Sequence, residues 1–270
     1  SVGGSGKTIL ARDILARLSG KPFALTRGYG GLLSGPILVD PVRHSAAEVG
    51  DEALLLAMTA PTIVAHDRAA GATLAREMGA SAIVMDDGLQ NPRLQKTAAF
   101  LVVDGGYGFG NGYLLPAGPL REPVAAAAAR CIAAVMIGDD VVGAQSQLPA
   151  NMPVLRARII PTCDTSLPGA RVVAFAGIGR PTKFFESVSQ LGAEIITKIT
   201  FPDHHVYSNA DAASLMTTAH AQQAQLLTTE KDFVKLPAEL KAQTMAVRVH
   251  LAWDDATALE AILRNVTAIL

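Results

Sequence analysis

The sequence is poor in cysteine and carries no excess of charge of one sign. Cys131 and Cys163 are the two cysteines in 270 residues, and their spacing fits neither a disulfide framework nor a metal-binding motif. There are 23 basic and 24 acidic residues, a net charge of −1, so no strong positive field would draw the chain to nucleic acid. These shortages argue against a disulfide-rich secreted protein and against a nucleic-acid-binding protein.

Long hydrophobic runs are also missing. The longest apolar stretch, residues 124–137, is interrupted by Arg130 and is too short to cross a bilayer. It fits an alanine-rich helix that leads into a buried strand, and no signal-peptide pattern is present. Half of the residues are apolar and only 17% are charged, which is typical of a well-packed globular protein of one large or two medium domains.

What the sequence does contain is a phosphate-binding loop at its start. Residues 1–8 read S-V-G-G-S-G-K-T and end as a Walker A motif ends, although Ser1 stands where the pattern has its first glycine. Small residues let backbone N–H groups surround phosphates, and the helix that follows adds a partial positive charge. Lys7 is expected to reach the β- and γ-phosphates of ATP, and Thr8 to bind Mg²⁺. The alternative is a glycine-rich turn that caps a helix. The expected nucleotide-binding residues are Gly3, Gly4, Ser5, Gly6, Lys7 and Thr8.

Helical and strand patterns alternate along the chain, which predicts an α/β fold with a mostly parallel sheet flanked by helices, as in P-loop NTPases. Gln, Pro, Ser and Asn become frequent between residues 144 and 169, and this change predicts a domain boundary. We expect a P-loop domain at 1–150, a smaller C-terminal α/β domain at 151–270, and a cleft between them. Residues 46–58 are predicted to form one helix.

Two carboxylates follow an apolar strand pattern at residues 82–85. Asp86 and Asp87 would stand at the carboxyl end of that strand, where a Walker B acid holds Mg²⁺ directly or through water. The alternative is a strand-ending Asp-Gly turn.

Two further segments contain residues suited to bind substrate. Arg27 ends a predicted strand and could hold a phosphate, and Tyr29 could pack on a sugar or a base. Prolines on both sides of Arg121 and Glu122 would fix that pair toward substrate or metal. A solvated arginine and an ordinary helix start are the respective alternatives.

A histidine pair could supply a base, a metal ligand or a phosphate contact. His204 and His205 follow Pro-Asp in a predicted loop, and the residues alone do not decide which of the two acts. Asp51 reads as a surface charge on the predicted helix. The glycines of G-I-G at 177–179 are weak support for a second anion site.

Taken together, these segments resemble the tetraacyldisaccharide 4′-kinase family of Gram-negative bacteria. The resemblance covers residues 2–236 and rests on motifs that occur in the same order: V-G-G-S-G-K-T, R-G-Y-G at 27–30, V-G-D-E at 49–52, D-D-G-L-Q at 86–90, the segment 115–123, G-I-G-R-P with F-F, F-P-D-H-H with Tyr207, and T-T-E-K-D at 228–232.

The resemblance implies transfer of the γ-phosphate of ATP to the 4′-hydroxyl of a tetraacylated glucosamine disaccharide 1-phosphate. It makes Asp51 the catalytic base, assisted by a histidine, for which we take His204, with Lys7 stabilising charge on the transferred group. The implied metal-binding residues are Thr8, Asp86, Asp87 and Glu122. The implied substrate-binding residues are Arg27, Tyr29, Gln90, Asn91 and Arg121.

The sequence departs from the family pattern at three positions. Leu89 and Asn91 replace the usual phenylalanine and histidine, and Ile9 replaces a proline. Asn91 cannot titrate, so a proton-transfer role is lost there. Family members carry a hydrophobic helix ahead of the loop, and the resemblance implies work at the cytoplasmic face of the inner membrane, through such a helix or through the protein surface. No obligate protein partner is expected.

A nucleotide-dependent switch of the partition or maturation type is the rival interpretation, because such ATPases share the G-G-x-G-K-T loop. It gives Asp51 and His204 no task. A ligase built on the same loop is a third, weaker possibility. Consumption of ATP in proportion to added lipid disaccharide would separate the kinase from the switch.

Overall fold

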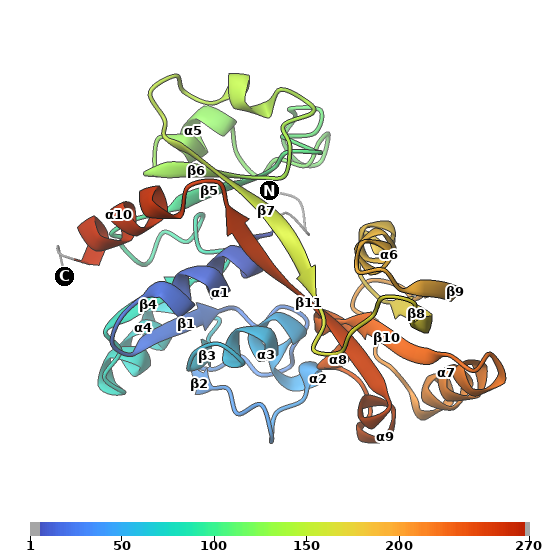
Figure 1. The fold of residues 1–270 in the computed structure, drawn as a ribbon. Coiled ribbons are helices and arrows are strands. Elements are labelled where there is room, and N and C mark those ends of the chain that lie inside the picture. The colour runs from blue at the N-terminus through green and yellow to red at the C-terminus, as the bar shows by residue number, and fades with distance from the viewer. Residues whose placement is uncertain (1–5, 268–270) are drawn as a thin grey trace. The chain divides into compact units, whose positions relative to one another are not determined.

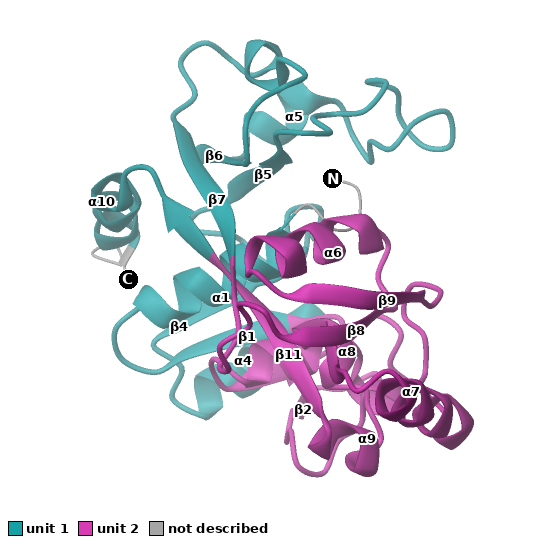
Figure 2. Cartoon of the chain, turned by 45° about the vertical axis from the view of Figure 1, so that its right-hand side comes forward, with its two compact units in different colours: residues 1–25, 68–160, 251–270 teal, residues 26–67, 161–250 magenta. Residues whose placement is uncertain are grey.

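The computed structural model describes residues 6–267, and the chain divides into two compact units (Figures 1 and 2). Unit 1 comprises residues 1–25, 68–160 and 251–270, and unit 2 comprises residues 26–67 and 161–250. The two units therefore interleave along the chain. The division into 1–150 and 151–270 is a different partition and stays a prediction.

Unit 1 combines parallel strands with helices. In it, β1 runs parallel to β4, with Leu25 opposite Met85, and β5, β6 and β7 form a second parallel group in that order. The described elements are α1 (Lys7–Arg17), β1 (Pro22–Thr26), α4 (Arg68–Glu77), β4 (Ala82–Met85), β5 (Phe100–Asp104), α5 (Val124–Ala128), β6 (Ala133–Ile137), a 3₁₀ turn (Ala144–Gln147), β7 (Val154–Thr162) and α10 (Ala256–Thr267). The last residues of β1 and β7 belong to unit 2.

The core of unit 1 fixes the helix that follows the phosphate loop. Leu10 and Ile14 lie one turn apart on α1 and pack against Val135 and Leu155 of the sheet and Leu259 of α10. The first turn of α1, with Lys7 and Thr8, is thereby fixed to the sheet.

Unit 2 contains parallel strands in the order β11-β10-β8-β9. It also contains a short antiparallel pair, β2 and β3. Its described elements are β2 (Ile37–Leu38), α2 (Ala46–Val49), α3 (Asp51–Ala57), β3 (Thr62–Val64), β8 (Arg171–Ala176), α6 (Pro181–Gln190), β9 (Glu194–Thr200), α7 (Asn209–Ala221), β10 (Gln225–Thr229), α8 (Glu230–Phe233), α9 (Ala238–Ala242) and β11 (Thr244–Trp253). The end of β11 belongs to unit 1.

Helices cover both faces of the unit 2 sheet (Figure 1). Alternate residues of β8 point to opposite sides: Ala174 packs with Phe184 of α6, whereas Phe175 packs with Leu215 of α7. All of β8 after its first residue is buried, as expected for a parallel strand covered on both faces. The predicted α/β class with a mostly parallel sheet is confirmed.

One local prediction was wrong. The helix predicted over 46–58 is two helices, because Gly50 has φ 86° and interrupts it. The region 144–169, where a domain boundary was predicted, contains β7, in which buried Leu155 and Ala157 alternate with exposed Arg156 and Arg158. The chain passes from unit 1 to unit 2 within this strand, after Ile160, and the domain boundary itself stays a prediction.

Candidate functional site

The phosphate loop is described from Gly6 onward. Gly3, Gly4 and Ser5, expected to contact nucleotide, lie outside the described residues. Gly6 precedes α1 with φ 89°, and a Cβ there would lie 2.5 Å from the Ile137 side chain. Both the backbone angle and the available space therefore require glycine. Lys7 and Thr8 occupy the first turn of α1, where unpaired N–H groups favour an anion.

Asp86 lies directly after β4 and contacts the phosphate loop. The Thr8 hydroxyl donates a hydrogen bond to Oδ2 of Asp86 at 2.7 Å, and the aspartate is 4% exposed. Burial raises the pKa of this carboxyl, although the Thr8 hydrogen bond and the Lys7 ammonium oppose the shift. A hydroxyl beside a buried carboxylate is the oxygen donor set with which P-loop proteins hold Mg²⁺, so these two residues fit the metal.

Asp87 forms ion pairs with two cationic side chains on the rim of the same site. The Lys7 ammonium lies 2.7 Å from Oδ1 and the Arg121 guanidinium 2.9 Å from Oδ2. Burial alone would raise the pKa of Asp87, but hydrogen bonds and charges from Lys7 and Arg121 outweigh it and lower the pKa. Asp87 itself has φ 51°, a left-handed conformation that aspartate tolerates in a tight turn. Lys7, which is predicted to bind phosphate, is thus held by an anion that a nucleotide could replace.

Glu122 belongs to a second cluster on unit 1. It accepts a hydrogen bond from the Gln90 amide at 2.8 Å and forms an ion pair with Arg130, which also donates to the Leu89 carbonyl. In the sequence, Arg130 is only an interruption of an apolar run, two residues after the end of α5. The single charge in an alanine-rich stretch was the signal for its role. The side chain of Asn91 accepts from the backbone N–H of Arg93 and so closes a turn.

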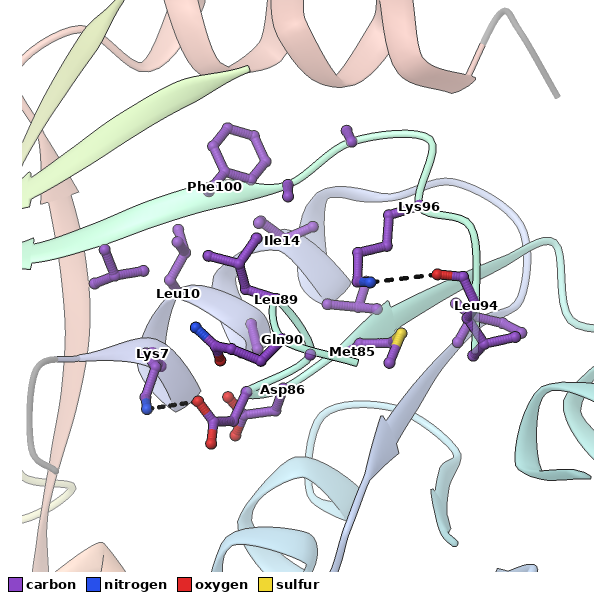
Figure 3. Close-up of a pocket in the computed structure, with 18 of the residues that line it drawn as sticks. Lys7, Leu10, Ile14, Met85, Asp86, Leu89, Gln90, Leu94, Lys96 and Phe100 are labelled. Carbon is purple, nitrogen blue, oxygen red and sulfur yellow. Dashed lines mark hydrogen bonds and ion pairs between the residues drawn. The ribbon is translucent and has the colours of Figure 1, made fainter. Parts of the chain in front are cut away.

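A pocket of about 930 Å³ extends from this charged rim into unit 1 (Figure 3). Lys7 and Asp86 lie at one end, whereas Leu10 and Ile14 of α1 and Phe100 of β5 line the interior. The polar groups that could bind phosphate and metal are concentrated at the P-loop end.

In unit 2, a close backbone approach places Asp51. Asp51 begins α3 because Gly50 breaks the preceding helix, and a Cβ on Gly50 would lie 2.5 Å from the Tyr29 carbonyl oxygen. A Cβ on Gly28 would in turn lie 2.8 Å from the Val49 carbonyl oxygen. Gly28 and Gly50 thus let the 27–30 loop pack against the junction that carries Asp51.

The structure brings His204 to Asp51. Nδ1 of His204 lies 3.0 Å from Oδ2 of Asp51, whose side chain is 3% exposed, whereas the histidine side chain is 36% exposed. A carboxylate only accepts, so this contact favours the tautomer with hydrogen on Nδ1 and leaves Nε2 as an acceptor. His205 pairs instead with Asp211 at 3.2 Å and stacks on Phe201. Between the two histidines, geometry selects His204 as the partner of Asp51.

The predicted substrate residues of unit 2 differ in their surroundings. The Tyr29 ring is 68% exposed, and its centroid lies 5.6 Å from that of His204. Arg27 is exposed directly after β1. Tyr29 therefore gives the Asp51–His204 pair an aromatic neighbour against which a sugar could pack.

Two lysines for which the sequence indicated no role also contact Asp51. Nζ of Lys231 lies 3.7 Å from Oδ2 of Asp51, and Nζ of Lys235 lies 3.9 Å from the same oxygen. Lys231 stood in the T-T-E-K-D motif without an assigned task. Lys235 lies between apolar residues and looks like a solvated lysine in the sequence.

Residues 6–267 contain neither a cluster of side chains that could hold a metal ion nor a helix that could span a membrane. No group of three or more His, Cys, Asp and Glu side chains is placed to hold a metal ion in that range. No helix in the same range is both long and apolar enough to cross a membrane. Thr8 and Asp86 therefore stand as a partial site of the kind that Mg²⁺ completes with phosphate oxygens and water.

The comparisons with known proteins agree with one another. The family profile described as tetraacyldisaccharide-1-P 4′-kinase matches residues 1–268. The tetraacyldisaccharide 4′-kinase of Gluconacetobacter diazotrophicus is 52% identical over 267 residues, which cover 97% of this chain and 82% of that protein. The enzyme of the same name from Rhodospirillum centenum is 49% identical, covering 97% of this chain and 79% of that protein.

A solved structure is also similar over nearly the whole chain. It is described as the "apo" form of LpxK from Aquifex aeolicus in complex with ATP. Its TM-score is 0.80 at 26% sequence identity, and the similarity covers 99% of this chain and 86% of that one.

Proposed function

The chain belongs to the tetraacyldisaccharide-1-phosphate 4′-kinase family, and from this premise we propose that it transfers the γ-phosphoryl group of ATP to the 4′-hydroxyl of a tetraacylated glucosamine disaccharide 1-phosphate. The observation that carries the proposal is the agreement of two kinds of site with that reaction. Unit 1 has Lys7 beside a Thr–Asp pair whose aspartate is buried, and unit 2 has an Asp–His pair whose aspartate is buried.

Unit 1 binds the nucleotide in this proposal. The N-terminus of α1 and Lys7 bind the phosphates of ATP, with the loop glycines before Lys7 as further contacts. Thr8 and Asp86 would hold Mg²⁺, with Asp87 and Glu122 as the further metal-binding residues of the proposal. The metal would neutralise negative charge on the phosphates of ATP. The Lys7 ammonium exchanges its ion pair with Asp87 for a contact with the negatively charged phosphoryl group that is transferred.

Unit 2 activates the acceptor. The 4′-hydroxyl gives its proton to the Asp51–His204 pair while its oxygen forms a bond to the γ-phosphorus and the bond to the β-phosphate oxygen breaks, which releases ADP. Asp51 acts as the base, and His204 orients its carboxylate through the 3.0 Å contact. Tyr29 packs on the sugar, and Arg27, Gln90, Asn91 and Arg121 are the proposed polar contacts to the disaccharide.

The substrate also bears on where the protein works. A tetraacylated disaccharide resides in a membrane, so we place the reaction at the cytoplasmic face of the inner membrane. Exposed apolar side chains on the loop of unit 1, among them Tyr113 and Leu115, support contact with a lipid surface. Sedimentation with anionic vesicles tests this placement, and a chain that stays in the supernatant at low salt with the lipid substrate present would contradict it.

The first experiment measures ATP-dependent phosphorylation of a tetraacylated disaccharide 1-phosphate by the wild type and by Asp51→Ala. We expect product from the wild type and a loss of about 10²-fold or more in the variant. Asp211→Ala is the matched control, because it breaks an Asp–His contact of unit 2 at His205 that does not involve the proposed base.

Each other outcome has a definite meaning. Product that Asp51→Ala does not reduce would keep the kinase and remove Asp51 as base. Binding of ATP without formation of any lipid product would remove the kinase and leave a nucleotide-dependent switch.

A further inference from the structure

A lysine is buried beside the proposed base. The Lys235 side chain is 5% exposed, and its ammonium lies 2.9 Å from Oδ1 of Asp232 and 3.9 Å from Oδ2 of Asp51. Removing an ammonium ion from water is costly unless anions and hydrogen bonds replace its solvation. A buried lysine next to a proposed catalytic carboxylate therefore calls for an explanation in terms of what it contacts.

The counter-ion of Lys235 is fixed by the backbone. Asp232 is fully buried, and its Oδ2 accepts hydrogen bonds from the Gly177 N–H at 2.9 Å and from the Thr229 hydroxyl at 2.8 Å. Its own N–H donates to the Thr229 hydroxyl oxygen at 3.0 Å. Since Gly177 follows β8 and Thr229 ends β10, this carboxylate is attached to the central sheet of unit 2.

Lys235 has hydrogen-bonding capacity to spare. An ammonium group carries three N–H donors, yet within residues 6–267 Nζ makes no well-aligned hydrogen bond, only the close ion pair with Asp232. The hydroxyl of Tyr207 is likewise buried without a well-formed bond, and its ring lies 5.7 Å from Nζ. Burial, reinforced by the Asp232 carboxylate, raises the pKa of Tyr207, so the phenol stays protonated. Nζ therefore retains a donor for Asp51.

The second lysine near Asp51 has a different environment. Lys231 is 23% exposed and lies 3.4 Å from Asp203 Oδ1 and 3.5 Å from Nε2 of His204, so it shares its charge with the open side of the pair. Lys235 approaches the same oxygen of Asp51, but its side chain is only 5% exposed and its other partner is the buried Asp232.

We propose that Lys235, anchored by Asp232, is a positioning residue that holds the carboxylate of Asp51 toward Nδ1 of His204. The inference rests on the proposed function of Asp51 as base. Fixed on one side by a buried cation and on the other by His204, Oδ2 of Asp51 is oriented before substrate arrives. The competing explanation is that the Asp232–Lys235 pair only stabilises unit 2.

The decisive variant is Lys235→Met, which keeps the length of the side chain and removes the charge. We expect kcat to fall about tenfold or more while KM for ATP stays unchanged, because a misoriented base slows the chemical step without affecting the nucleotide site. Lys241→Met is the matched control, since Lys241 packs on Phe233 in the same unit and is not among the residues placed at Asp51. Lys235→Arg keeps the charge and should restore part of kcat.

Lys235→Met leaves Asp232 buried without its cation, so loss of folding must be separated from loss of positioning. The double variant Lys235→Met/Asp232→Asn removes both charges and keeps the shape of the core. A cooperative melting transition in the double variant together with the same fall in kcat supports positioning. Wild-type kcat in a folded single or double variant would overturn the proposal.

A second readout does not depend on activity. The titration of Asp51 is followed by the ¹³C signal of its side-chain carboxyl, which is assigned by its loss in Asp51→Asn. The charged groups around Asp51 are His204 from the loop after β9, Lys231 on α8 and Lys235 after it, which contact its carboxylate, and Asp203 and Asp232, which pair with them. Removing the positive charge of Lys235 should move the midpoint to higher pH than in the wild type, and Lys241→Met should leave it in place.

The two readouts separate this proposal from the proposed function. If the wild type makes no lipid product but the Asp51 midpoint moves in Lys235→Met, the kinase assignment fails and the contact with Lys235 stands. If product forms and Asp51→Ala abolishes it, while Lys235→Met changes neither kcat nor the midpoint, the positioning role fails and the kinase stands.

Discussion

Asp86 of unit 1 and Asp51 of unit 2 are both buried aspartates at a junction of elements, and their neighbours differ. Asp86 faces a hydroxyl, and burial raises its pKa because the Thr8 hydrogen bond and the Lys7 charge do not compensate fully. Oδ2 of Asp51 has the nitrogens of His204, Lys231 and Lys235 within 3.9 Å. The Asp86 carboxylate thus lacks compensating positive charge that a metal can bring, whereas the chain itself supplies positive charge to Asp51.

The lysines show the same contrast. Lys7 pairs with Asp87, whose side chain is 39% exposed, so water or a phosphate can replace either partner at little cost. Lys235 and Asp232 are buried, and removing one leaves the other without solvation. The lysine proposed to bind a transient ligand is thus exchangeable, and the lysine proposed to orient a side chain is buried.

The largest effect that tests this contrast is expected from Lys7→Met. It removes the cation that stabilises the transferred phosphoryl group, and kcat/KM should fall about 10³-fold. The midpoint of thermal unfolding should change little, because the pair with Asp87 is partly exposed. Kinetics and calorimetry on the same preparation measure both. A marked loss of stability would show that Lys7 is structural and would break the contrast with Lys235.

A smaller effect of mixed sign is expected from Asp86→Asn. The variant should lose about 10²-fold in activity at a fixed Mg²⁺ concentration, because an amide is a poorer ligand for Mg²⁺. Its free energy of unfolding without metal should rise, since the substitution removes a buried carboxyl whose raised pKa shows that its charge is unfavourable in the fold. Urea unfolding with a chelator, at neutral pH, measures the second quantity. A less stable variant would contradict the view that the Asp86 carboxylate lacks compensating positive charge.

The smallest effect concerns acid stability and Asp87. Lys7 and Arg121 lower its pKa in the fold, so its contribution to stability is complete above the ordinary aspartate value of 3.8 and is lost as the pH falls through the lower value. Asp87→Asn should therefore show a shallower decline of the unfolding midpoint below that pH than the wild type does. Thermal melts between pH 2 and 6 measure the difference. Parallel curves would mean that the pair is solvated and adds nothing.

The sequence allowed the unit 1 site to be predicted largely from two short segments, the phosphate loop and the acidic pair Asp86 and Asp87. A lysine and a threonine after glycine, and an acidic pair after an apolar strand, meet in the fold because both strand ends and helix starts face one edge of a parallel sheet. The pairing of Thr8 with Asp86 follows from this geometry. Residues before Gly6 that were predicted to bind nucleotide stay a prediction.

The unit 2 site was less accessible to sequence reasoning. Asp51 reads as a surface charge because its burial depends on Gly50, which breaks the helix, and on a loop of glycines twenty residues earlier in the chain. Lys235 was missed because nothing in its neighbours along the chain tells a buried lysine from a solvated one. Pairing over long sequence separation, as between Asp51 and His204, has no local signal; only the family resemblance pointed to it.

The way the chain passes between the units has a practical consequence. The division falls after Leu25, Asp67, Ile160 and His250, and three of these points lie inside strands β1, β7 and β11. Neither half corresponds to a continuous stretch of gene, so cutting the coding sequence once cannot yield either as a separate product. A recombination event that exchanged one half between relatives would need several crossovers, and we expect both halves to be inherited together.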